Sequence, residues 1–172
     1  MSLLKQDIKL KINMKVKDLL EELCEKECYK KFIGENPSAF FAAAFFIMDL
    51  KQKTETIQLD FFLPEQKKIT AFEYPFIKAK IFDEEMKSMT PQATEIKINI
   101  DDLESVCKEI IKNNDSLIIA TKIIAILKDN QWNLTCMDDM LGIVRIKINA
   151  INGKQIAFSK GSLMDFMGIK KK

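Results

Sequence analysis

Histidine is absent from the 172-residue chain, and arginine occurs once, as Arg145, against 26 lysines. The lack of histidine excludes Ser-His-Asp and Cys-His nucleophilic pairs, histidine acid/base catalysis and every metal site that needs an imidazole. Glycine is also scarce, and no GxGxxG or GxxxxGK[ST] nucleotide-binding loop is present. The composition therefore favours a protein that is not an enzyme, and it predicts neither a cofactor nor a metal.

Long apolar runs are missing as well. The longest uncharged apolar stretch, residues 39–48, is about half of the roughly 20 residues that a membrane-spanning helix needs. Four charged residues within residues 1–11 leave no room for the apolar core of a signal peptide. These absences predict a cytoplasmic protein with no membrane partner. The four cysteines form no CxxC pair, and we interpret them as small buried side chains.

Two halves of the chain follow a similar order of patterns. In the first, residues 8–17 alternate like a half-exposed strand, and helical spacing follows from Asp18 to about Gly34. In the second, residues 95–100 alternate, a helix opens at Asp101, and residues 117–127 form a further helical run. The matching segments lie 84 to 89 residues apart. This regular offset predicts a tandem repeat.

Strands are expected later in each half. Residues 39–48 suit either a helix or a strand, and their likeness to residues 132–137 favours a strand. Residues 57–69 and 144–156 each predict a hairpin, the second closed by Asn152-Gly153. The prediction is an α+β fold of two diverged strand-helix-meander repeats, with antiparallel sheets packed against helices. Residues 1–82 form the first repeat, 83–94 the connector and 95–172 the second repeat.

Phenylalanine is concentrated in the first half, where ten of the twelve lie before residue 83 and six form adjacent pairs. Neighbours on a strand point to opposite faces, so the first-half sheet has apolar side chains on both faces. The second face either packs within the chain or binds a protein partner, a second copy of the chain or an apolar ligand. The candidate binding residues are Phe40, Phe46, Phe62, Tyr74 and Phe76.

We therefore expect a non-enzymatic protein-binding or regulatory module that acts through a Phe-rich sheet face, with a protein partner or a homodimer. A charge introduced at Phe46 or Phe62 should then alter assembly and leave the second half folded. Two alternatives stay open. One is a nucleic-acid-binding protein that uses lysine-rich strands, as in residues 9–17. The other is a small histidine-independent enzyme that uses carboxylates, such as those of Asp138-Asp139, or lysine.

The order of a helix and a three-strand meander, with the turn Asn152-Gly153-Lys154 and the return Ile156-Ala157-Phe158, resembles tandem PepSY-type domains. The resemblance covers residues 117–159 and, less closely, residues 18–74. PepSY domains are small, mostly extracytoplasmic modules implicated in binding and in regulating peptidases. The resemblance thus implies a binding function.

Overall fold

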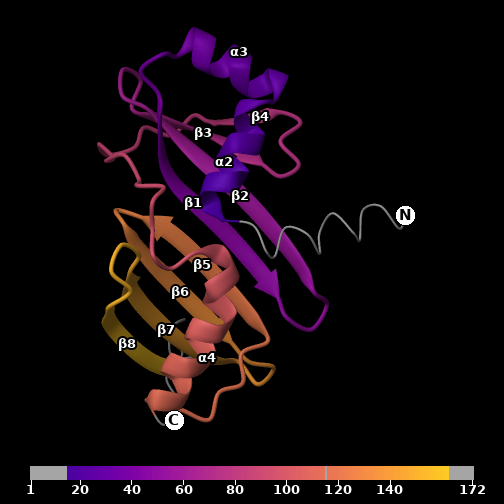
Figure 1. Ribbon diagram of the computed structural model, residues 1–172, viewed down its shortest axis with the longest axis vertical. Helices are drawn as coiled ribbons and strands as arrows, with labels where there is room; N and C mark the ends of the chain where they lie inside the picture. Colours follow the sequence, from indigo (N-terminus) through magenta and orange to yellow (C-terminus); the bar gives the residue numbers. More distant parts are fainter. Residues whose placement is uncertain (1–14, 115, 163–172) are drawn as a thin grey trace.

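One antiparallel sheet of eight strands dominates the protein (Figure 1). The structure is a computed structural model that describes residues 15–114 and 116–162. The strand order is β4-β3-β2-β1-β5-β6-β7-β8, so each half of the chain contributes four consecutive neighbouring strands. The strands are β1 (Phe40–Asp49), β2 (Thr54–Leu63), β3 (Lys68–Glu73), β4 (Ala79–Phe82), β5 (Lys122–Lys128), β6 (Gln131–Met137), β7 (Gly142–Asn149) and β8 (Gln155–Ser162).

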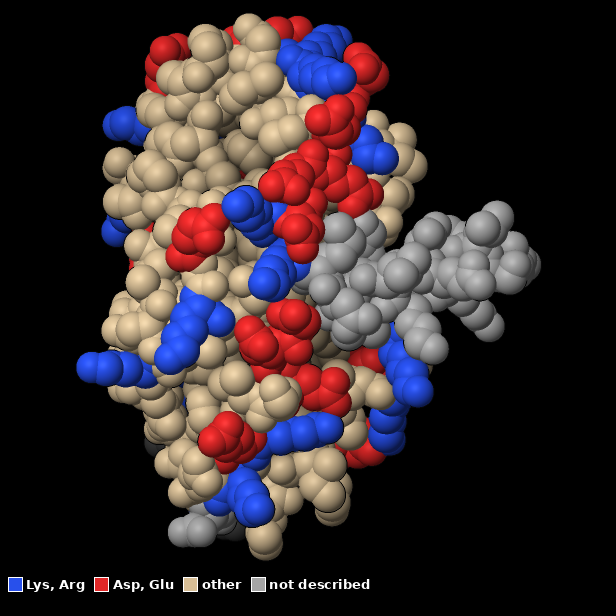
Figure 2. Space-filling view, in the orientation of Figure 1, with Lys and Arg blue, Asp and Glu red and all other residues tan. Residues whose placement is uncertain are grey.

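All described helices lie on one side of this sheet (Figure 1). Helix α2 (Val16–Cys24) and helix α3 (Glu27–Glu35) cover strands of the first half, and α4 (Leu103–Asn113) covers strands of the second. A short 3-10 helix, η1 (Ile100–Asp102), precedes α4. Each helix turns an apolar stripe to the sheet and its polar residues to water, so charges of both signs are interspersed over the helix side (Figure 2).

The two halves share one hydrophobic core because strands β1 and β5 pair edge to edge. Their antiparallel register runs from Ala43 opposite Lys128 to Asp49 opposite Lys122. Across this seam, the rings of Phe46 on β1 and Trp132 on β6 lie 5.8 Å apart, and both are fully buried. The seam removes one edge from each group of four strands, which would otherwise expose unpaired backbone groups.

Asn99 connects the helices of the two halves. Its side-chain Oδ1 accepts a hydrogen bond of 3.0 Å from the backbone N–H of Val16, at the first turn of α2. Its own backbone N–H donates to Asp102 Oδ2 at 2.8 Å, at the start of the second-half helix. An otherwise unpaired N–H at the start of α2 is thereby satisfied by a residue 83 positions away.

The segment between the halves is also held in place. Gln92, which is buried, accepts at Oε1 from the backbone N–H of Asn130 at 2.8 Å and donates from Nε2 to Asn130 Oδ1 at 3.0 Å. The backbone N–H of Gln92 donates to the carbonyl of Phe41 at 2.9 Å. This network fixes the predicted connector to β1 and to the β5–β6 turn.

The predicted fold is wrong in its main feature. The protein is built on a single sheet with short helices, not on two strand-helix-meander repeats with separate antiparallel sheets. Residues 95–100 do not form the expected strand, because their backbone makes isolated bonds to Ala150 and then enters η1. The expected helix over 117–127 is instead mostly strand β5, where β-branched isoleucines pair with β1 and β6.

Other expectations are confirmed. Residues 39–48 form a strand and not a helix, and both predicted hairpins are present as β2–β3 and β7–β8. Gly153 has a φ of 78°, the conformation that its turn requires. The predicted helix from Asp18 is present but divides into α2 and α3 at residues 25–26. Most of the alternating segment at residues 8–17 lies outside the described residues.

Candidate functional site

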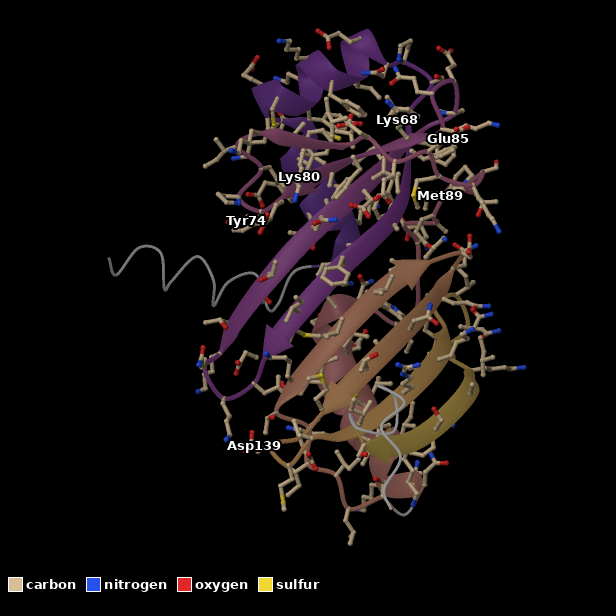
Figure 3. The ribbon with its side chains drawn as sticks, turned by 180° about the vertical axis from the view of Figure 1, so that it is seen from behind. Lys68, Tyr74, Lys80, Glu85, Met89 and Asp139 are labelled. Atoms are coloured by element: carbon tan, nitrogen blue, oxygen red, sulfur yellow. The ribbon has the colours of Figure 1, made fainter. Side chains whose placement is uncertain are left out.

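The face of the sheet opposite the helices is the candidate site, and we call it the open face. Figure 3 looks onto this face, with the helices behind the strands. Side chains alternate along each strand, so the residues between the core positions of β1, β2 and β5–β7 point to the open face. On β1, for example, Phe46 and Met48 enter the core, whereas Phe45 and Ile47 point away from it.

Four apolar side chains lie at the centre of the open face, on the two seam strands. Phe45 is directly opposite Ile126, and Ile47 is directly opposite Ile124. Phe45, Ile47 and Ile124 are half-buried, and Ile126 is 36% exposed. We call these four residues the central patch. Cross-strand pairs of this kind shield one another only in part, so the patch remains an apolar surface in contact with water.

The flanks of the central patch carry charges of opposite sign. On the β2–β3 side the charged residues of the open face are Asp60 and Glu73. On the β7 side they are Arg145 and Lys147. Next to these two basic residues the surface is hollowed by about 320 Å³, and the hollow is lined also by Asn133, Thr135, Ala157 and Ser159. Lys122 and Lys128 lie at the two ends of the central patch on β5, and Lys80 lies beyond the acidic residues on β4. Between these lysines, the open face has an acidic flank (Asp60 and Glu73), an apolar centre and a basic, hollowed flank.

Asp60 is the most unusual polar group on this face. Its burial raises the pKa of its carboxyl above the ordinary value of 3.8, while the hydrogen bond from Gln58 Nε2 to Asp60 Oδ1, at 2.8 Å, acts in the opposite direction. Its register neighbours are alanines, Ala43 on β1 and Ala71 on β3, which contribute no compensating charge. A carboxylate kept at such a position destabilises the fold, and groups of this kind cluster at binding sites.

Phe40 and Phe62, two of the predicted binding residues, lie on the same side of the sheet as the central patch but are covered within the chain. Their rings are 5.6 Å apart, and Phe62 is buried with Ala42 and Ile69. Met86 and Met89, both from residues 83–94, pack against them. Figure 3 shows Met89 at the margin of β1 and β2, on the side toward the viewer. The chain itself therefore occupies this part of the second apolar face.

The other three predicted residues are on the helix side or the margin. Phe46 is 1% exposed and packs against Trp132 of the second half, so a charge there would disrupt the shared core and would not leave the second half folded. Phe76 is equally buried, and its carbonyl accepts a hydrogen bond from Cys28 Sγ at 3.2 Å. Tyr74 is half-buried, and its ring lies 5.4 Å from that of Phe76.

The central patch was not predicted from the sequence, for two reasons. Phe45 belongs to an adjacent pair, and the sequence does not say which of two neighbours faces the helices. Ile124 and Ile126 lie in a segment that was expected to be helical, although their alternation with Ile123, Ala125 and Leu127 fits a strand.

The acid pairs and the cysteines do not form a reactive centre among the described residues. Asp138 and Asp139 occupy the β6–β7 turn, where Asp138 Oδ1 accepts from the backbone N–H of Met140 at 2.9 Å and Asp139 pairs with Lys51 across the seam. Hydrogen bonding to Lys51 lowers the pKa of Asp139. Within residues 15–114 and 116–162, no cluster of three acidic or cysteine side chains suits a metal ion. Cys107 is buried as expected, whereas Cys24 is exposed, which corrects the expectation for that cysteine.

Comparisons with known proteins assign no family. No family model matches the chain, and no curated protein matches it significantly. Among solved structures, the chain is similar to a "putative lipoprotein" from Clostridium difficile 630, with 11% identity and a TM-score of 0.49 over 77% of this chain and 90% of that one. This similarity is too low to transfer a function, and the PepSY resemblance stays a prediction. No described helix has the length and apolar character needed to span a bilayer.

Proposed function

We propose that the protein is a non-enzymatic protein-interaction module that acts through the open face, and that the surface it binds is the open face of a second copy. The observation that carries the proposal is the central patch, where Phe45, Ile47, Ile124 and Ile126 form an apolar surface at the middle of a wide sheet. Contiguous apolar surface with a polar rim is typical of association sites.

The charge pattern favours a second copy as the partner. A two-fold axis parallel to the strands, placed between two facing sheets, sets the central patch of one copy over that of the other. The same operation brings the acidic flank, with Asp60 and Glu73, over the basic flank, with Arg145 and Lys147. One surface is then complementary to itself in both its apolar and its charged parts.

The size of the open face is also adequate. Six strands about 4.8 Å apart, each about seven residues long, give a surface of roughly 650 Å² in projection. A standard protein interface buries about 800 Å² on each partner, and a pleated surface exceeds its projection.

Sedimentation equilibrium over a range of protein and salt concentrations tests the proposal. The wild-type chain is expected to dimerise, and more weakly at high salt because charged groups meet across the interface. Ile126→Asp places a carboxylate in the central patch and is expected to give a monomer. Ile81→Asp is the matched control, since Ile81 is also exposed but pairs in register with Thr70 and so lies on the helix side of the sheet.

The two variants are first compared by circular dichroism, so that loss of the fold is not mistaken for loss of the dimer. A wild-type chain that stays monomeric at the highest concentration reached would refute the proposal. So would a dimer that Ile126→Asp and Ile81→Asp weaken equally.

A further inference from the structure

A groove on the helix side, between α3 and the β3–β4 end of the sheet, has no role in the proposed dimer. Its volume is about 480 Å³, within the range of ligand sites. We call it the α3–β4 groove. Its buried lining includes Phe32, Leu63 and Thr70, and its exposed rim includes Ile77 and Ile81.

The rim exposes more apolar surface than the fold needs. Ile77 is 79% exposed and Ile81 is 67% exposed, and both border the same groove. Single exposed isoleucines are ordinary, but two at the mouth of an apolar depression form a surface that another apolar group can cover. The groove therefore suits a ligand with apolar side chains.

Thr70 adds a polar feature inside the groove. It is 3% exposed, and it carries the only side-chain hydroxyl among the buried lining residues Phe32, Leu63 and Thr70. A ligand with a backbone carbonyl or N–H in the groove can hydrogen-bond to this hydroxyl.

The charges of the groove indicate the sign of the ligand. Three lysines border it, namely Lys31 from α3, Lys68 from β3 and Lys78 from the segment before β4, against one acidic residue, Glu35. The three cations come from three separate segments around the apolar lining. A ligand with one anionic headgroup meets only one of them, whereas a peptide with several carboxylates meets them all.

We infer that the α3–β4 groove binds an extended peptide segment of a partner protein in which acidic and aliphatic side chains alternate. The aliphatic side chains cover Ile77 and Ile81, the carboxylates approach the three lysines, and the peptide backbone hydrogen-bonds to Thr70. This site lies on the opposite side of the sheet from the central patch and does not depend on the proposed dimer.

Fluorescence polarisation with a labelled hexapeptide of alternating glutamate and isoleucine tests this inference. Binding is expected to weaken with salt, and a peptide with lysine in place of glutamate is expected not to bind. Lys78→Glu should weaken binding about five- to tenfold, because it replaces an attraction with a repulsion. Thr70→Val should weaken it by a smaller factor, because the side chain keeps its shape and loses only its hydroxyl.

Lys80→Glu is the matched control. Lys80 lies on β4, two residues from Lys78, but its register partner is Ala71, and its Nζ lies 5.2 Å from the centre of the Phe82 ring on the open face (Figure 3). Lys80→Glu changes the net charge of the protein as much as Lys78→Glu does, but its affinity for the glutamate peptide is expected to equal that of the wild type. Equal losses in Lys80→Glu and Lys78→Glu would refute the site, as would failure of the glutamate peptide to bind.

Two further measurements separate the remaining explanations. Decanoate is titrated alongside the peptide, and binding of decanoate without binding of the peptide would overturn the inference in favour of a single-headgroup amphiphile. Ile126→Asp is expected to bind the peptide as the wild type does, whether or not the chain dimerises. A loss of peptide binding in this variant would contradict the independence of the two sites.

Discussion

Phe45 and Phe46 are adjacent on β1, and replacing each with alanine separates the fold from the proposed interaction. Phe46 is fully buried against Trp132, so Phe46→Ala leaves a cavity in the shared core and is expected to cost about 3–5 kcal/mol. Part of this cost is the aromatic contact, which is worth about 1 kcal/mol beyond its buried area. Phe45 is half-buried on the open face, and Phe45→Ala is expected to cost about 1 kcal/mol.

Urea unfolding followed by fluorescence measures both costs, because Trp132 is the only tryptophan and lies at the seam. The experiment is done at a protein concentration low enough to keep the chain monomeric, since dimerisation would add apparent stability. Phe46→Ala should lower the urea midpoint strongly. Phe45→Ala should lower it little and, at higher concentration, weaken the dimer.

Equal costs for the two substitutions would refute the assignment of faces, and a larger cost for Phe45→Ala would reverse it. Domains are stable by only about 5–15 kcal/mol, so the Phe46→Ala chain has a measurable fraction of its stability removed. If it is unfolded without denaturant, Phe46→Leu provides a milder version of the same comparison.

Three further predictions concern single groups. Burial raises the pKa of Asp60 in the folded chain, so its carboxyl favours folding most at acid pH, below the unfolded value near 3.8, and this contribution is lost as the pH rises through the folded pKa. Asp60→Asn should therefore raise the urea midpoint at pH 7 but not near pH 3. An equal rise at both pH values would show that the charge of Asp60 is not the cause. Gln92→Ala removes the hydrogen bonds to Asn130 and should lower the free energy of unfolding by about 1–3 kcal/mol. An unchanged free energy of unfolding would show that these hydrogen bonds do not stabilise the fold. Hydrogen bonding to Cys136 and burial both raise the pKa of Cys107, so iodoacetamide should modify exposed Cys24 in the native protein and Cys107 only after unfolding. Peptide mass mapping measures the modified cysteines, and modification of Cys107 in the native protein would contradict its burial.

The sequence by itself determined the local elements whose signals are short-range. The hairpins β2–β3 and β7–β8 follow from alternation and from the turn around Gly153, and the strand β1 could be inferred from its likeness to residues 132–137. The absence of histidine, a property of composition alone, determined which chemistries are excluded. These properties depend on neighbouring residues or on composition, and no long-range contact changes them.

Only the tertiary structure decided which face of each strand is buried and how the two halves join. The pairing of β1 with β5 connects segments about 80 residues apart, and alternation within either strand does not specify the partner. That pairing placed Phe46 in the core and Phe45 in the central patch, and packing of Met86 and Met89 covered the phenylalanines that sequence reasoning had favoured as a binding surface. The absence of histidine and the single arginine thus limit the chemistry of the chain, while the seam between β1 and β5 creates the surface proposed to bind.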